Sequence, residues 1–337
     1  MWLNLLMKVS ILIPTLNRLG FLKESLTSVR QQNYANLEIL VSDDGSQDGT
    51  SAFVRDMEAI DPRVHLVSPN PVPGLFTNVN HLIQHSRGDA FSILGDDDRL
   101  LPDFVQKTVG PLVRDPKVVA SFCDHWVIDR EGTLLREASE KNSRYYGRTA
   151  LPEGEVREPL TQVMRGSMCM GFSLYRSAIF QKEQFDVSCG GAADLDYAIR
   201  AAQLGKLYYV KERLGEYRVH ATTATVSRPA YMINGAIQVF RKHSFAEKRY
   251  EKMRKRILRS KYRDESFYIC ANNRDQCLRA MTKYLALRGN PFDAKIVLSL
   301  LLTLLPQSIA ISLKSLLQNV RKLVAPLLGI GRPFSER

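Results

Sequence analysis

The feature that most constrains this chain is a run of three consecutive aspartates, Asp96–Asp98, directly after a short apolar segment. Residues 89–93 form that segment, which indicates a buried strand that ends in a loop at Gly95. Three adjacent carboxylates repel one another, so a fold holds them most easily against a divalent cation, hydroxyl groups or solvent. A solvated acidic turn is the plainer alternative. Because α/β proteins bind ligands at strand ends of this kind, the loop is the first candidate site.

The segments around this loop predict an α/β fold. β-Rich segments occupy residues 8–13, 37–41, 64–67 and 89–93, and amphipathic helical segments lie between them. Strand and helix alternating at such short spacing predict a doubly wound, mostly parallel sheet with helices on both faces. In that sheet the loops after the first, second and fourth strands share one edge, which brings together residues 14–18, 43–46 and 96–98. This convergence favours a ligand site over a solvated turn.

The rest of the chain predicts further strands and then only helices. Strands are expected at residues 118–122, 126–128, 168–175 and 207–210, and a charged, irregular excursion at 139–158. Asp194 is placed to cap a helix over 195–204 that ends at Gly205. From residue 231 the pattern is helical. We therefore expect a catalytic domain at 1–230 and a helical, basic and amphipathic region at 231–337.

Charge is distributed unevenly along the chain. Residues 1–240 carry 26 Lys and Arg against 28 Asp and Glu, whereas residues 241–337 carry 21 against 7. The net charge of +12 therefore resides entirely in the C-terminal third. Basic residues at 248–263 and apolar residues at 296–324 suggest peripheral contact with an anionic membrane. Packing of helices on the main domain explains the apolar residues equally well.

The five cysteines include no Cys-x-x-Cys pair, which indicates free thiols in a reducing compartment. No stretch reaches the roughly 20 apolar residues that span a bilayer. From these two features together with the basic third we predict a cytoplasmic protein, peripheral on the inner face of the membrane.

Several motifs together resemble the family 2 glycosyltransferases, which have the GT-A fold. The resemblance rests, in order and spacing, on residues 9–18, 41–50, 95–102, 193–200 and 217–220. The family implies transfer of a sugar from a nucleoside diphosphate to an acceptor hydroxyl, with inversion and with Mg²⁺ or Mn²⁺ as cofactor. It also implies roles for single residues. The nucleotide-sugar contacts would be Pro14, Thr15, Asn17, Asp43, Asp44 and Asp96.

The same resemblance assigns the metal and the base. Asp97 and His220 match metal-binding positions, although a lone His after a strand is commonly just hydrogen-bonded. Aligned on Pro102, the family's first acidic position falls on Gly95, so this sequence departs from the usual pattern. Asp194 matches the catalytic base, and Ala193 replaces the Glu that usually precedes it. Inversion needs such a carboxylate, because the acceptor hydroxyl must lose its proton as it attacks.

We expect a hexosyltransferase of bacterial cell-surface polysaccharide synthesis (an O-antigen or capsule, for example, or lipopolysaccharide), acting on a sugar or lipid-linked saccharide acceptor. A nucleotidyltransferase is one alternative, but it would need a Gly-rich basic loop after the first strand, and residues 14–18 contain no Gly. A nucleic-acid-binding protein using residues 248–263 is another, but no recognition motif accompanies them. We therefore expect no nucleic-acid partner.

Overall fold

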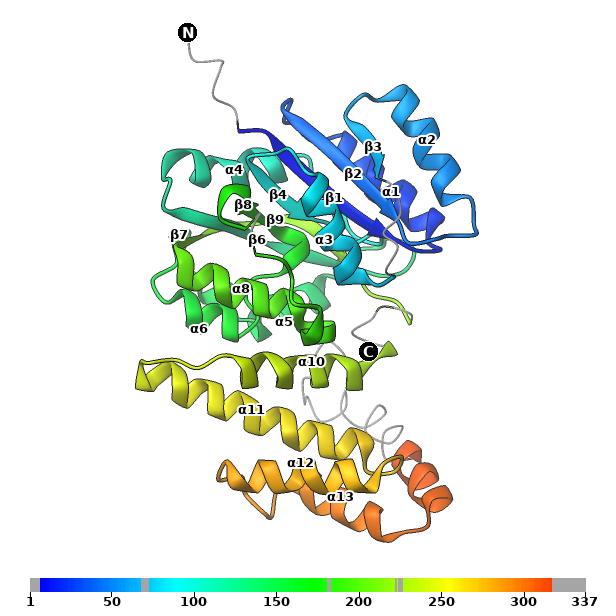
Figure 1. Ribbon diagram of the computed structural model, residues 1–337, viewed down its shortest axis with the longest axis vertical. Helices are drawn as coiled ribbons and strands as arrows, with labels where there is room; N and C mark the ends of the chain where they lie inside the picture. Colours follow the sequence, from blue (N-terminus) through cyan, green and yellow to red (C-terminus); the bar gives the residue numbers. More distant parts are fainter. Residues whose placement is uncertain (1–6, 68–72, 181–182, 222, 224–226, 317–337) are drawn as a thin grey trace. The chain divides into compact units, whose positions relative to one another are not determined.

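The computed structural model describes residues 7–67, 73–180, 183–221, 223 and 227–316 (Figure 1). The chain forms two compact units, Met1–Val187 with Asp194–His220, and Ser188–Ala193 with Ala221–Arg337. The functional division at residue 230 stays a prediction. The last part of the apolar segment predicted at 296–324 lies outside the described residues.

The first unit is an α/β fold. Its strands are β1 (Val9–Thr15), β2 (Leu37–Asp43), β3 (Val64–Val67), β4 (Ala90–Ile93), β5 (Arg99–Leu100), β6 (Val118–Ile128), β7 (Gly154–Glu155), β8 (Ser173–Arg176) and β9 (Lys206–Arg218). Its helices are α1 (Leu19–Arg30), α2 (Thr50–Ile60), α3 (Leu75–His85), α4 (Phe104–Arg114), α5 (Arg136–Tyr145), α6 (Pro159–Met164), α7 (Ser177–Phe180) and α8 (Ala193–Leu204). Within the described residues, nine strands form one sheet in the order β3-β2-β1-β4-β8-β6-β9-β5, and β7 pairs with β9.

The sheet is parallel where the sequence predicted it to be. β3, β2, β1 and β4 pair in parallel, and the register sets Thr15 opposite Asp43 at the carboxyl ends of β1 and β2. β8 then enters antiparallel between β4 and β6, while β6 and β9 pair in parallel. The predicted α/β class and mostly parallel sheet are confirmed. The arrangement places the ends of β1, β2 and β4 on one edge.

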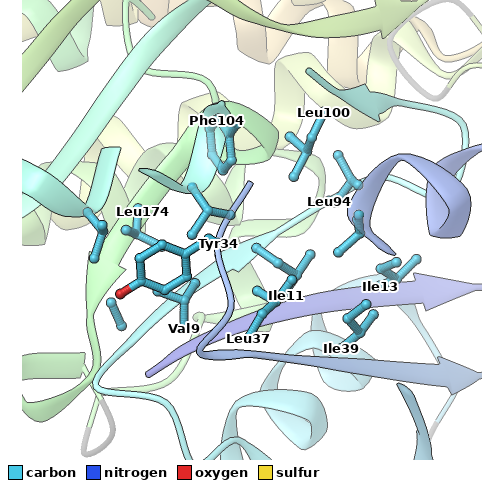
Figure 2. Packing of buried hydrophobic residues seen from close by; sticks show 14 of the residues in the cluster. Val9, Ile11, Ile13, Tyr34, Leu37, Ile39, Leu94, Leu100, Phe104 and Leu174 are labelled. Carbon is cyan, nitrogen blue, oxygen red and sulfur yellow. The ribbon is translucent and has the colours of Figure 1, made fainter. Parts of the chain in front are cut away.

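Both faces of the sheet are covered by helices (Figure 1). Alternate residues of a strand point to opposite faces, and Val9, Ile11 and Ile13 of β1 pack in one core cluster with side chains of α1 and α4 (Figure 2). On the other face Phe91 of β4 contacts Tyr175 and Tyr197, at ring-centroid distances of 5.6 and 6.4 Å. Helices on both sides bury β1 and β2 completely, which explains their continuous apolar sequences.

The excursion predicted at residues 139–158 is wrong. This segment holds the end of α5, the short 3₁₀ helix η1 (Arg148–Ala150) and β7. Arg148 is 1% exposed, and its Nε donates to Asp124 Oδ1 at 2.6 Å. One of the charges in this segment is thus neutralised inside the protein, where a buried ion pair is stable only with good hydrogen-bond geometry.

The second unit is helical. It contains α10 (Pro229–Lys242), α11 (Lys248–Ile269), α12 (Arg274–Ala286) and α13 (Ala294–Leu304), together with residues 188–193. A side chain on Gly235 of α10 would meet Cys189 O at 2.4 Å, so glycine lets that loop approach the helix. Among the described residues, no helix combines the length and the apolar character needed to cross a membrane.

Candidate active site

The acidic loop starts where β4 ends. Leu94 N donates to Leu12 O at 2.9 Å, and Asp98 N donates to Gly95 O at 3.1 Å, so the loop turns sharply after the strand. A Cβ on Gly95 would lie 3.0 Å from carboxylate oxygens of both Asp97 and Asp98. Glycine therefore lets the two carboxylates fold back over the chain. This close approach gives the departure from the usual acidic pattern at Gly95 a physical reason.

Asp96 points toward the end of β1. Its Oδ2 accepts from Thr15 Oγ1 at 2.9 Å, and its Oδ1 accepts from Arg18 Nη1 at 3.0 Å. The residue is 6% exposed, and burial raises the pKa of Asp96 to about 6 although Arg18 opposes the shift. Asp96 thus joins the first loop to the acidic loop, as the shared edge of the sheet predicted.

Asp97 binds two side chains through one oxygen. Its Oδ2 lies 2.9 Å from Arg18 Nη1 and 2.9 Å from His220 Nε2. The His220 ring stacks on Phe21 of α1, with centroids 5.0 Å apart. Residues far apart in sequence therefore bring a carboxylate and an imidazole together, which are the two residue types predicted to hold a metal.

Arg218 stabilises the acidic loop through hydrogen bonds to Asp97 and Asp98. Its backbone N–H donates to Asp98 Oδ1 at 2.9 Å, and its Nε donates to Asp97 O at 2.8 Å. Its Nη2 donates to Glu24 of α1 at 2.6 Å, and the residue is fully buried. Burial, and then the neighbouring charge of Asp97, raises the pKa of Asp98 well above its ordinary value. Asp98 and Arg218 therefore shape the loop rather than face a ligand.

The loops after β1 and β2 hold each other. Asn17, with a left-handed φ of 52°, donates its backbone N–H to Ser46 Oγ at 2.7 Å and accepts from Gln47 N through Oδ1 at 2.8 Å. Asp43 is 1% exposed, and its two oxygens accept from Ser46 N and Ser51 Oγ at 2.9 and 2.5 Å. The side chains of Asn17 and Asp43 are therefore structural parts of the loops that the sequence assigned to the nucleotide sugar.

Asp44 and Pro14 also lie at this edge. Asp44 N donates to Thr15 O at 2.9 Å, and Asp44 Oδ2 accepts from Gly74 N at 2.9 Å. Pro14 is opposite Ser42 in the sheet. Asp44 is only half-buried, so of the two adjacent acids it is the one with surface left for a ligand.

Asp194 stands at the start of α8. Its side chain is half-buried, its Oδ1 accepts from Leu195 N at 2.8 Å, and burial raises the pKa of Asp194 to about 6. Asp194 accordingly combines a helix-terminal position with a basicity suited to proton transfer near neutral pH.

The acidic loop and His220 offer side chains of the types that bind a divalent cation. Across the described ranges, no three His, Cys, Asp or Glu side chains form a ready metal cage. Mg²⁺ is usually held by one or two carboxylates together with substrate phosphates, so a site with fewer than three protein ligands can still bind it. Carboxylate and imidazole also suit Mn²⁺. The pair of Asp97 and His220 therefore fits a divalent cation that is shared with a bound phosphate.

The structure brings together Thr15, Asp96, Asp97 and His220, and it places Asp194 at the start of α8 in the same unit. Sequence reasoning placed Arg18 in the converging loop but gave it no role, and it missed Phe21 and Glu24 as neighbours of the site. Their signal was weak but present, because both follow Arg18 at helical spacing on α1.

A comparison with known families matches residues 10–182 to the model described as "Glycosyl transferase family 2", just over half of the chain. One relative is a GalNAc(5)-diNAcBac-PP-undecaprenol beta-1,3-glucosyltransferase from Campylobacter jejuni, 25% identical over 89% of this chain and 94% of that protein. Another is a chondroitin synthase from Escherichia coli, also 25% identical, over 65% of this chain but only 30% of that protein. Neither a nucleotidyltransferase nor a nucleic-acid-binding protein is favoured by these matches.

Solved structures agree on the fold. A mannosyltransferase from Pyrobaculum calidifontis in complex with GDP-Man and Mn²⁺ matches with a TM-score of 0.60 and 17% identity, over 95% of this chain and 88% of that one. TarS residues 1–349 from S. aureus, in complex with UDP-GlcNAc, match with a TM-score of 0.61 and 14% identity, over 83% and 81%. With the family model spanning the acidic loop and the loops after β1 and β2, this chain belongs to glycosyl transferase family 2.

Proposed function

We propose that this enzyme transfers a sugar, with inversion, from a nucleoside-diphosphate donor to the hydroxyl of a lipid-linked saccharide during synthesis of a bacterial cell-surface polysaccharide. The observation that carries the proposal is the contact of Asp97 with His220, beside Asp96 bound to Thr15. These contacts gather carboxylate and imidazole groups at the carboxyl ends of the strands, where α/β folds bind nucleotides.

The donor's nucleoside lies, in this proposal, against the loops after β1 and β2. Pro14, Thr15 and Asp44 form its contact surface, since Asp44 keeps exposed area while Asp43 is enclosed by Ser46 and Ser51. Asn17 serves by holding the two loops together. Asp96 faces the ribose through the carboxylate that Thr15 orients.

Asp97 and His220 would hold the divalent cation, with diphosphate oxygens completing its coordination. When bound, that cation neutralises the charge that develops on the departing diphosphate. Phe21 keeps the His220 ring in place by stacking, and Arg218 fixes the backbone of Asp97. The chain's own residues thus orient both groups before the donor arrives.

Asp194 acts as the general base. A carboxylate with a pKa of about 6 is mostly ionised at pH 7 and still basic enough to accept the acceptor's proton. Its hydrogen bond from Leu195 N fixes one oxygen and leaves the other to the acceptor hydroxyl. Attack from the face opposite the leaving diphosphate gives inversion.

Membrane contact is a further part of the proposal, since a lipid-linked acceptor resides at a membrane surface. Helix α13 exposes apolar side chains, and α11 exposes cationic ones. The apolar set is Val297, Leu300, Leu301 and Leu304, and the cationic set is Lys248, Lys252, Lys255 and Arg256. Shallow insertion of the first set and attraction of the second to anionic lipid would hold the enzyme at the cytoplasmic face.

The test is a screen of UDP- and GDP-sugars for diphosphate release, with Mg²⁺ and with Mn²⁺, using membrane extracts as the acceptor source. Acceptor-dependent release from one donor, lost in EDTA, is expected. An enzyme that released no diphosphate from any nucleotide sugar would contradict the proposal. Asp103→Asn, which alters a half-buried carboxylate that accepts a hydrogen bond from Asn33 Nδ2, serves as the control protein.

A further inference from the structure

The guanidinium of Arg18 bridges two carboxylates of the acidic loop. Its Nη1 lies 3.0 Å from Asp96 Oδ1 and 2.9 Å from Asp97 Oδ2. The same Asp97 oxygen lies 2.9 Å from His220 Nε2. One side chain therefore offsets part of the charge of both members of the acidic pair.

A divalent cation held by both Asp97 and His220 would take Asp97 Oδ2, because that oxygen faces His220, and it is the oxygen that Arg18 contacts. Mg²⁺ binds carboxylate oxygens at about 2.0–2.1 Å, a distance that leaves no room for a hydrogen-bonded guanidinium on the same side of that oxygen. Two positive groups beside one carboxylate pair also repel each other at short range. Arg18 and the metal are therefore alternatives at Asp97.

The Arg18 side chain can move away from the acidic loop without disrupting the fold, whereas the Arg218 side chain cannot. The Arg18 side chain is 29% exposed, and its backbone is fixed independently because its carbonyl accepts from Leu22 N at the start of α1. The Arg218 side chain is 0% exposed and donates to Asp97 O, Arg130 O and Glu24. Rotation of the Arg18 side chain costs no helix hydrogen bond, while moving Arg218 would dismantle the loop.

We propose that Arg18 is the resident counter-ion of Asp96 and Asp97, that a divalent cation displaces it, and that the released guanidinium pairs with the diphosphate of the donor. A guanidinium binds phosphate oxygens through two parallel hydrogen bonds, so the group expelled by the metal suits the ligand that arrives with it. Arg18 thus offsets part of the negative charge of the acidic pair between turnovers. This inference rests on the proposed function for the identity of the donor.

The exchange predicts opposite effects of one substitution on two ligands. In Arg18→Gln the affinity for Mn²⁺ alone, measured by EPR of the free ion, should rise about tenfold, because a competing positive charge is gone. At saturating Mn²⁺ the affinity of the same variant for UDP or GDP, measured by calorimetry, should fall about tenfold, because a charged phosphate contact is lost. Arg18→Lys keeps the charge and should leave Mn²⁺ affinity within about twofold of the wild type.

Two controls keep the result interpretable. Arg55→Gln removes an equal charge from an exposed position on α2 and should change neither affinity. Arg18→Met repeats the Mn²⁺ measurement with an unbranched apolar side chain, in case Gln disturbs folding. Circular dichroism of each variant checks the fold.

Unchanged or weaker Mn²⁺ binding in both Arg18→Gln and Arg18→Met would overturn the counter-ion role. Unchanged UDP and GDP affinity in these variants would overturn the role on the diphosphate. Failure of the proposed function has a different signature, because a wild-type protein that binds neither nucleotide can still show the competition between Mn²⁺ and Arg18.

Discussion

The acidic loop and helix α11 each gather charge of one sign, but they treat it in opposite ways. In the loop, Asp96 and Asp98 are each 6% exposed, and every carboxylate accepts a hydrogen bond from a named donor. On α11, Lys252, Lys255 and Arg256 face solvent. Buried, paired charge fixes geometry and shifts pKa values, whereas exposed charge acts over a distance set by salt. The acidic loop is therefore suited to holding reacting groups in a fixed geometry, and α11 is suited to attracting an anionic surface.

The largest effect is expected at Asp97. Asp97→Asn removes the charge that Arg18 and His220 share, and with it the carboxylate proposed for the metal. Loss of metal stabilisation of the leaving group is worth several kcal/mol, so transfer should fall by about 10³-fold or more. The fold should persist, because the amide has the same shape and Arg218 still holds the backbone. Steady-state rates and circular dichroism measure the two quantities.

EDTA is the matched reagent test of the same site. Chelation should reduce the wild-type rate to the level of Asp97→Asn, and added Mn²⁺ should restore the wild type but not the variant. Full activity of either Asp97→Asn or the EDTA-treated enzyme would leave Asp97 as a purely structural partner of His220.

Asp194→Asn should have the next largest effect. A general base contributes about 10²–10⁴-fold, and the amide keeps the hydrogen-bonding position beside Leu195 N. kcat should therefore fall within that range while donor affinity stays near the wild-type value. A variant that lost donor affinity but kept its rate at saturation would show that Asp194 is a helix cap or a binding residue instead.

Much of this site could be predicted from sequence because its chemistry lies on local patterns. Short apolar runs ending in polar loops located β1, β2 and β4, and parallel pairing then forced Thr15 and Asp96 onto one edge. The link from Asp97 to His220 spans 123 positions, and only the family resemblance suggested it. Long-range contacts of this kind carry no periodic signal.

What sequence could not show is which charges are neutralised. Arg148 was expected in a solvated excursion, yet it is buried against Asp124. Arg254 belongs to the basic stretch 248–263, yet it donates to Glu251 and to Phe240 O. Pairing depends on residues brought close by tertiary packing, so a charge count along the chain overstates the free charge of α11.

That pairing sharpens the choice of residues for a membrane test. The triple variant Lys252→Glu, Lys255→Glu and Arg256→Glu avoids Arg254 and changes exposed residues only. Each Lys or Arg near an anionic surface contributes about 1 kcal/mol, so vesicle binding at low salt should weaken by about 10²-fold. Co-sedimentation with anionic and neutral vesicles over a salt series measures the effect.

The control for net charge is Arg55→Glu, Lys117→Glu and Lys211→Glu, three exposed positions in the first unit. It changes the total charge equally but should leave vesicle binding close to that of the wild type. Equal loss in both triple variants would assign the attraction to overall charge rather than to α11.

The smallest predicted effect is a dependence on pH that kcat shows and vesicle binding does not. Asp194 has its pKa raised to about 6 by burial, and a general base works only when ionised. kcat should therefore fall about tenfold between pH 7.5 and pH 5, with half of the loss near pH 6. Lys and Arg keep their charge throughout this interval, so vesicle binding through α11 should not change.

Thermal unfolding distinguishes loss of the base from acid unfolding. Because the folded pKa of Asp194 lies above the unfolded value near 3.9, its contribution to the free energy of unfolding is present at low pH and is lost as pH rises through about 6. Asp96, whose pKa is also raised to about 6, contributes with the same sign. Buried His125, whose pKa is lowered well below its ordinary value, contributes with the opposite sign as pH falls through about 6.5. Thermal unfolding at both pH values measures the net change, and the difference between wild type and Asp194→Asn isolates the share of Asp194. The pH dependence near 6 should disappear from the residual activity of Asp194→Asn, and its persistence there would identify Asp96 as the titrating group instead.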